Sequence, residues 1–416
     1  MHTAVLWYGV FVTEIENKKK QIITPIYLTQ LIWMGWVILV DSQRILMKEI
    51  NKLTRSFLVL YVFFTISCSE KTIEINDPES NNLYFPSTDS EEWESKSPEE
   101  LSWNTSAIDS LYDFLEQRNT RAFIILKDGR IILENYWGNN ITNTKAFDKN
   151  SLWYWASAGK TLTAFLVGIA QEQGLLTIED ASSTYLGNGW TNSNEEQESL
   201  IKIKHQLTMT TGLDYEVDNP FCTDPNCLLV KFTPGTNWFY HNAPYTLLRE
   251  VIENASQTSY NNFSDQHIEN KIGMSGIWTR SNFDNVYTST ARDMARFGLL
   301  ALNKGVWNNE VILNDANYFS NMVNSSQEFN EAYGYLWWLN GKSNLIIPGL
   351  TIQLNRHLVP NGPEDLIAGL GKNGQFIDVV PSKNMVIIRM GEDPDNSLVP
   401  INFHNEMWVH LNKILN

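Results

Sequence analysis

The chain has 416 residues, 43% of them hydrophobic and 12% aromatic, which is enough to bury a large core in one two-lobed unit or in two domains. A formal net charge of -16 and a pI near 4.9 would repel phosphate backbones and argue against a nucleic-acid partner. Three cysteines, seven histidines and the absence of His-Glu-x-x-His and Cys-x-x-Cys motifs argue against a metal site, and no cofactor is expected.

The N-terminal segment is interpreted as a leader. Residues 1–46 contain a broken apolar stretch and are taken as an upstream extension that precedes a true start at Met47. Basic residues then precede a short apolar run over residues 57–66, followed by Cys68. Because this run is too short to span a bilayer, the pattern predicts a lipoprotein signal peptide over residues 47–68 with Cys68 as the lipid acceptor. An ordinary membrane anchor helix is the alternative.

This interpretation implies an exported protein, anchored to the membrane of a bacterial cell envelope through an N-terminal lipid. Residues 69–104 are rich in Glu, Ser, Asp, Asn and Pro and are expected to form an acidic, disordered tether. Cys222 and Cys227 lie close together in the sequence. In an exported protein they are expected to form a disulfide, the alternative being two free thiols.

The folded domain is expected over residues 105–416. Apolar spacing predicts helices, and apolar runs that flank turn residues predict strands. The predicted elements, in chain order, are a helix over 108–115, a hairpin over 123–136 around Asp128-Gly129, a helix over 157–173 ended by Gly174, a helix over 291–303, a hairpin over 376–390 and a helix over 401–415. This order predicts an α+β fold, with an antiparallel sheet built from both chain ends and flanked by helices, and a mostly helical lobe over residues 175–290 inserted.

The pair Ser157-x-x-Lys160 stands where an aromatic run gives way to the predicted buried helix. One helical turn places the two side chains on the same face. Burial would lower the pKa of Lys160 and make it a usable base for the Ser157 hydroxyl. Ser199-x-x-Lys202 has the same spacing but sits in a segment whose lysine is expected to be solvated. By itself, Ser157 would be interpreted as a simple helix cap.

Tyr240-x-Asn242 follows a Pro-Gly turn that would present it to a site. A tyrosine can relay a proton if a nearby cation lowers its pKa, and Asn242 could hydrogen-bond a substrate amide. A second match, Tyr260-x-Asn262, lacks the preceding turn and is expected to be structural.

A third motif, Lys372-Asn373-Gly374, precedes a predicted strand that starts at Gln375. Lys372 could hold the tyrosine phenolate or a substrate carboxylate, and Gly374 could let the substrate backbone approach. The backbone N–H groups of Ser157 and Gln375 could form an oxyanion hole. By itself, Lys372 would be a solvated loop lysine.

Together the three motifs resemble those of the penicillin-recognising serine hydrolases, in the class C beta-lactamase-like branch that includes DD-peptidases, esterases and nylon-oligomer hydrolases. The resemblance runs from about residue 105 to the end. It implies Ser157 as acylated nucleophile, Lys160 as its base and Tyr240 as proton relay, with Asn242, Lys372, Asn373, Gly374 and Gln375 at the substrate. Asn373 replaces the threonine of the usual Lys-Thr-Gly, which puts beta-lactam hydrolysis in question.

The sequence therefore predicts a cell-envelope serine hydrolase that forms an acyl-enzyme with a small amide or ester. A non-catalytic or slowly deacylating ligand-binding or sensor module on the same fold is the alternative, and multiple-turnover kinetics separate the two.

Overall fold

The computed structural model describes residues 83–415 of the chain. The predicted extension over 1–46, the signal peptide over 47–68 with Cys68, and residues 69–82 of the tether lie outside the described residues. Among the helices that are described, none combines the length and apolar character needed to cross a membrane.

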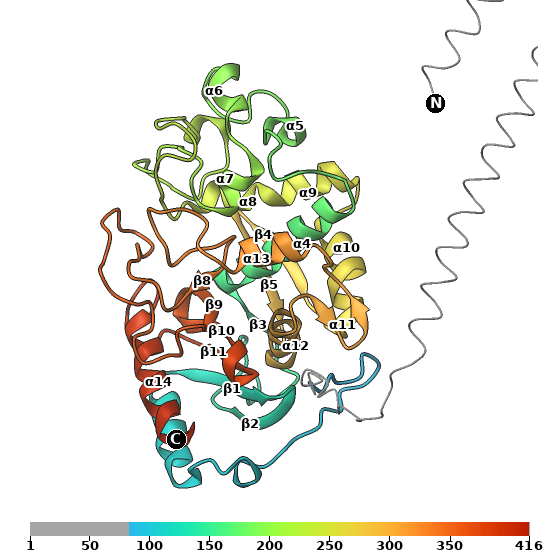
Figure 1. The fold of residues 1–416 in the computed structure, drawn as a ribbon, viewed down its shortest axis with the longest axis vertical. Helices are drawn as coiled ribbons and strands as arrows, with labels where there is room; N and C mark the ends of the chain where they lie inside the picture. Colours follow the sequence, from blue (N-terminus) through green and yellow to red (C-terminus); the bar gives the residue numbers. More distant parts are fainter. Residues whose placement is uncertain (1–82, 416) are drawn as a thin grey trace, which may run out of the picture. The chain divides into compact units, whose positions relative to one another are not determined.

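A six-stranded antiparallel sheet joins the two ends of the described domain, as the sequence predicts. Strands from residues 120–136 lie beside strands from residues 367–391, teal beside red in Figure 1. In spatial order the strands are β2 (Arg130–Tyr136), β1 (Thr120–Lys127), β11 (Met385–Gly391), β10 (Gln375–Val380), β9 (Ile367–Gly371) and β8 (Trp338–Leu339). The β1–β2 hairpin turns at Asp128 and Gly129, which both have positive φ, as such a tight turn requires.

Helices cover both faces of this sheet. Successive strand residues point to opposite faces. Phe376 stacks on Phe403 of α14 (Ile401–Leu415), which also packs against α3 (Ile108–Gln117). The next residue, Ile377, faces α12 (Ala291–Leu302), where Gly298 allows close contact because an added Cβ would clash with the Val386 side chain. The three helices match the predicted ones closely.

The chain between the two halves of the sheet forms a lobe of short helices and a small second sheet. This second sheet has the order β3 (Trp153–Tyr154), β5 (Asp284–Ser289) and β4 (Ile277–Ser281). The helices are α5 (Ser183–Leu186), α6 (Glu195–Ser199), α7 (Ile203–Leu207), α8 (Asn242–Thr246), α9 (Leu248–Ser256), α10 (Tyr260–Ser264) and α11 (Asn270–Ile272). The sequence did not predict the β4–β5 hairpin, whose residues are largely polar and partly exposed.

Helix α4 (Lys160–Glu172) is the central helix of the domain, and its first eleven residues are buried. It ends before Gly174, as predicted, and that glycine has a φ of 70°. The predicted start at residue 157 differs from the structure, where a 3₁₀ turn, η3 (Ala156–Gly159), precedes the helix. The remaining strands and α-helix of the described residues are β6 (Val306–Trp307), β7 (Glu310–Val311) and α13 (Ala316–Met322).

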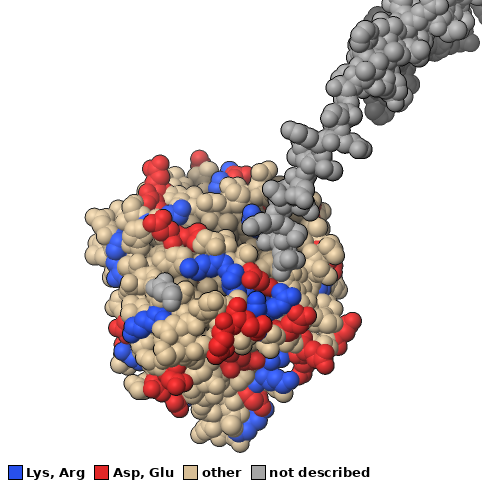
Figure 2. Space-filling view, turned by 60° about the horizontal axis from the view of Figure 1, so that its bottom comes forward, with Lys and Arg blue, Asp and Glu red and all other residues tan. Residues whose placement is uncertain are grey.

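Residues 83–104 pack on the domain, so the predicted disorder is wrong for this part of the tether. The indole of Trp93 donates to the carbonyl of Gly129 (2.7 Å). The guanidinium of Arg296 lies over the rings of Trp93 and Trp307 and donates to the carbonyl of Ser87 (2.9 Å). The prediction of disorder was based on the acidic composition of this segment and missed these aromatic contacts. Acidic and basic side chains are mixed on the face of the molecule in Figure 2.

Candidate active site

The serine turn, η3, is held from two sides. On one side it follows β3, and the backbone N–H of Trp155 donates to Tyr287 of β5 (2.8 Å). On the other side lies β9, where Gly371 permits contact because an added Cβ would come within 2.5 Å of the Trp155 carbonyl oxygen. Ala156 has a φ of 47°, a left-handed conformation that costs roughly 1–2 kcal/mol in a non-glycine residue. The surrounding sheets therefore hold Ser157 in a strained turn.

Lys160 is buried directly beneath this serine, with 4% of its surface exposed. Its Nζ lies 3.0 Å from Ser157 Oγ and 2.9 Å from Asn242 Oδ1. It also lies over the rings of Tyr245 and Tyr240, at 4.1 and 5.2 Å from their centroids. Burial lowers the pKa of Lys160 to about 7, and the charge of Asp284 opposes part of this effect. The predicted serine–lysine pair is therefore present with a lysine that can lose its proton near neutral pH.

Tyr240 and Asn242 reach the same point from the start of α8. The ring of Tyr240 stacks on Trp338, with centroids 6.0 Å apart, and is 8% exposed. Burial raises the pKa of the Tyr240 phenol above its usual value, and the side chain of Ser157 opposes this only in part. The sequence analysis made a relay role depend on a cation that lowers this pKa, whereas burial raises it. Tyr240 is a protonated phenol at pH 7.

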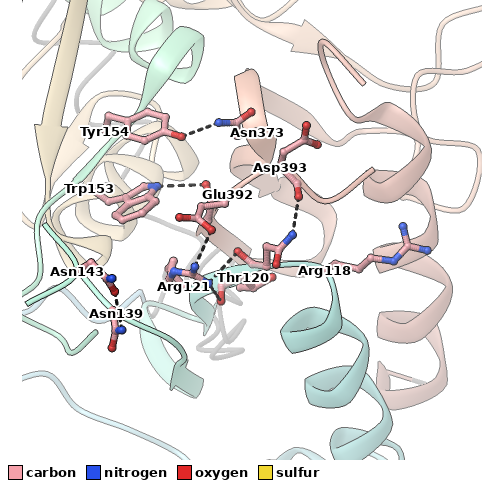
Figure 3. Close-up of polar contacts among 12 residues, drawn as sticks. Arg118, Thr120, Arg121, Asn139, Asn143, Trp153, Tyr154, Asn373, Glu392 and Asp393 are labelled. Carbon is pink, nitrogen blue, oxygen red and sulfur yellow. Dashed lines mark hydrogen bonds and ion pairs between the residues drawn. The ribbon is translucent and has the colours of Figure 1, made fainter. Parts of the chain in front are cut away.

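The third motif forms a 3₁₀ turn, η6 (Lys372–Gly374), between β9 and β10. Lys372 lines the cavity described below. Asn373 instead donates to the hydroxyl of Tyr154 (2.7 Å), and Figure 3 shows the two side chains pointing toward one another. The buried Gln375 side chain is hydrogen-bonded to both backbone groups of Gly391 (2.6 and 3.0 Å).

Of the four substrate-contacting residues predicted over 372–375, only Lys372 therefore lines the cavity. Asn373, Gly374 and Gln375 shape the turn, because their polar groups and backbone are used within the protein.

A fully buried guanidinium, that of Arg389 on β11, holds this turn in place. It donates to the carbonyls of Gly374 (3.0 Å) and Asn373, and the rest of its donors face the start of β1 and the end of β11. These further acceptors are Arg118 O (2.8 Å), Glu392 O (3.1 Å) and Thr120 Oγ1 (3.2 Å). Burial lowers the pKa of Arg389 to about 9. Sequence analysis missed this residue, since an arginine within an apolar strand carries no motif.

A cavity of about 460 Å³ opens onto Ser157. Its walls are mostly apolar and aromatic, and the fixed charges on them are Asp284 and Lys372. Besides the predicted residues, they include Tyr154, Phe221, Phe239, Tyr245, Val286, Pro348, Leu398 and Val399. Trp337 and Trp338 are buried in the core. Sequence analysis missed Tyr245 and Asp284, although Tyr245 stands one helical turn after Asn242.

The two competing motif matches are structural. Lys202 is partly exposed and pairs with Glu179 (2.8 Å), so it is solvated as predicted. The hydroxyl of Tyr260 shares a hydrogen bond with Thr163 (2.8 Å) in the core. These two matches supply no base or phenol to the cavity.

The structure joins Cys222 and Cys227 in a disulfide, with Cα atoms 5.9 Å apart. The loop that it closes follows Phe221 in the cavity wall. No group of three or more His, Cys, Asp or Glu side chains suited to a metal occurs in the described part of the chain.

Comparison with known proteins identifies relatives of the chain. The beta-lactamase family model matches residues 111–398. An uncharacterised protein of Alkalihalophilus pseudofirmus is 24% identical over 64% of this chain and 81% of its own length. A candidate penicillin-binding protein of Bacillus subtilis, PbpX, is 24% identical over 57% of this chain and 61% of its own length.

Among solved structures, a candidate 6-aminohexanoate-dimer hydrolase of Bacillus anthracis aligns with a TM-score of 0.59 at 18% identity. The alignment covers 81% of this chain and 90% of that one. At this identity the likeness concerns the fold.

Proposed function

The chain belongs to the beta-lactamase family, and we propose that it is a serine hydrolase that forms an acyl-enzyme at Ser157 with a small amide or ester. The observation that carries the proposal is the 3.0 Å contact between Ser157 Oγ and the buried Nζ of Lys160, whose pKa is about 7. A serine is a weak nucleophile unless a neighbouring base takes its proton. At neutral pH a large fraction of Lys160 is the free amine that can do so.

In the proposed first step, Ser157 Oγ attacks the substrate carbonyl carbon while its proton passes to the Lys160 amine. The C–O bond forms, and the carbonyl π electrons move to the oxygen. When the tetrahedral intermediate collapses, the phenol of Tyr240 donates its proton to the departing nitrogen or oxygen, and the Lys160 ammonium returns a proton to the phenolate. Water then attacks the acyl-enzyme and releases the acid. A protonated Tyr240 suits this acid role.

The oxyanion requires backbone donors. The N–H of Ser157 makes no hydrogen bond within residues 83–415 and is the first proposed donor. We place the second at the junction of β9 and η6, at the N–H of Lys372, rather than at Gln375. This placement rests on Gly371 packing against the serine turn and on Lys372, but not Gln375, lining the cavity.

The proposed substrate class agrees with the names of the relatives, which include a 6-aminohexanoate-dimer hydrolase and a penicillin-binding protein. A location in the cell envelope remains part of the proposal. The disulfide between Cys222 and Cys227 supports it, because such bonds persist mainly in oxidising compartments.

The test is labelling of the full chain with a fluorophosphonate probe, read as intact mass, together with steady-state hydrolysis of simple esters. We expect one adduct on the wild type, none on Ser157→Ala, and at least a thousandfold loss of turnover in that variant. Ser199→Ala, from the solvated match, is the control and should label normally. A fully active Ser157→Ala protein would sink the proposal, and a burst without steady-state turnover would favour the slowly deacylating module.

A further inference from the structure

Asp284 is a carboxylate on the cavity wall that the proposed chemistry does not use. It begins β5, lines the cavity beside Ser157 and Lys160, and is exposed. Its side chain makes no ion pair and no hydrogen bond with any described residue. The charge of Asp284 nevertheless acts on Lys160, because it raises the pKa of that lysine against the effect of burial.

Two basic side chains that contact or pair with the residue next to Asp284 are engaged elsewhere. Arg280, across the β4–β5 hairpin, pairs with Glu250. Arg249 pairs with Glu253 (3.3 Å) and donates to the side chain of Asn285 (3.3 Å). Because of these contacts, neither Arg280 nor Arg249 neutralises the charge of Asp284.

The charged groups of the cavity itself do not neutralise Asp284 either. Lys160 holds Ser157 and Asn242, and its lowered pKa makes it largely neutral above pH 7. Lys372 belongs to η6, beside Tyr154 and β9, and makes no ion pair with Asp284. The carboxylate of Asp284 therefore faces the cavity without a cationic partner.

The wall around Asp284 is apolar and aromatic. Val286 lies two residues along the same strand, and Pro220 and Phe221 line the same cavity. The loop that carries Phe221 is attached to the β4–β5 hairpin, because Thr223 Oγ1 accepts a hydrogen bond from Arg280 (3.4 Å). Apolar walls reduce screening of a carboxylate, and an aromatic face also attracts cations.

We propose that Asp284 is a specificity-determining residue that selects amide or ester substrates carrying a cationic group, an ammonium in particular. The inference rests on the proposed function and names the substrate class of that same site. The cation lies against Asp284 and the Phe221 wall while the scissile carbonyl lies at Ser157. The recognition requires no covalent step at Asp284.

The test uses two pairs of isosteric esters that differ only in a quaternary nitrogen or carbon. Butyrylthiocholine and S-(3,3-dimethylbutyl) thiobutyrate place the cation on the leaving group. The p-nitrophenyl esters of 4-(trimethylammonio)butyrate and 5,5-dimethylhexanoate place it on the acyl group. We expect the full-length wild type to favour the cationic member of at least one pair by about tenfold in kcat/KM, and less at high salt.

Asp284→Asn should bring that ratio close to one, whereas Asp109→Asn, an exposed control on α3, should leave it unchanged. Any effect of the variant on Lys160 is common to both members of a pair and cancels in the ratio. Hydrolysis without cationic preference, or a preference that survives Asp284→Asn, overturns the inference and leaves the proposed function standing. Failure to hydrolyse all four esters overturns the proposed function, and the inference with it.

Discussion

Lys160 and Arg389 are both buried cations close to the candidate site, and neither has a carboxylate partner among the described residues, yet their surroundings differ. The Nζ of Lys160 has two polar partners, Ser157 and Asn242, and otherwise faces aromatic rings. The guanidinium of Arg389 has four backbone carbonyls and one hydroxyl around it. Burial lowers both pKa values by a similar amount, from 10.5 to about 7 for Lys160 and from 12.5 to about 9 for Arg389.

The two values differ because a guanidinium starts from a higher pKa than an ammonium. Desolvation disfavours the charged form of both groups, and hydrogen bonds to that form restore part of the loss. Arg389 stays charged at neutral pH and holds η6 in place, whereas Lys160 is close to giving up its proton. With a similar response to burial, the Lys160 amine becomes a base, whereas the Arg389 guanidinium stays a charged donor to its acceptors.

Among the substitutions that test this contrast between Lys160 and Arg389, Lys160→Met has the largest expected effect. Without a base for Ser157, fluorophosphonate labelling and ester turnover should fall by about a thousandfold or more. The free energy of unfolding should rise by about 1 kcal/mol or more, because an apolar chain replaces a poorly solvated buried amine. Labelling kinetics and urea denaturation measure the two changes.

Lys202→Met is the matched control, since it removes a lysine from the solvated motif and should change neither property measurably. A Lys160→Met protein that keeps its activity, or that loses both activity and stability, would contradict the interpretation of Lys160 as a poorly solvated base.

Arg389→Met should change stability in the opposite direction. The variant removes the Arg389 donor from the buried carbonyl of Gly374 and from the partly buried carbonyls of Asn373 and Arg118, and each buried group left unsatisfied costs about 1–3 kcal/mol. We expect the free energy of unfolding to fall by about 3 kcal/mol or more, as measured by urea denaturation.

Arg121→Met provides the comparison, because Arg121 lies nearby and pairs with the exposed Glu392 (2.7 Å) (Figure 3). Loss of such a pair should cost less than about 1 kcal/mol. Equal losses in the free energy of unfolding would show that the acceptors around Arg389 do not make it more stabilising than Arg121.

Much of the fold could be predicted from the sequence because its main elements carry strong local signals. Helices α12 and α14 have apolar spacing over three or more turns, and the β1–β2 and β10–β11 hairpins place turn residues between apolar runs. The β4–β5 hairpin carries mainly polar residues, so its strands lack this signal. The order of residues 83–104 was missed because the average composition of this segment is acidic. A few aromatic side chains nevertheless anchor it to the domain.

The candidate site divides in the same way. The Ser157–Lys160 contact follows from one helical turn, so a local spacing predicts it. Asp284 reaches the cavity, and β9 reaches the serine turn, through tertiary packing that no local spacing encodes. The direction of the pKa shift at Tyr240 was missed because it comes from burial, which depends on tertiary packing.

The smallest effect that we predict is the pH dependence of an otherwise unaltered enzyme. Lys160 must be neutral to accept the Ser157 proton, so kcat/KM for a neutral ester should be constant above its pKa of about 7 and fall about tenfold per pH unit below it. Asp284→Asn should move this midpoint to lower pH, because the carboxylate raises the pKa of Lys160 and its loss lets burial dominate. A midpoint near 10, the pKa of a solvated lysine, would mean that Lys160 is as well solvated as an ordinary surface lysine, and its contrast with Arg389 would disappear.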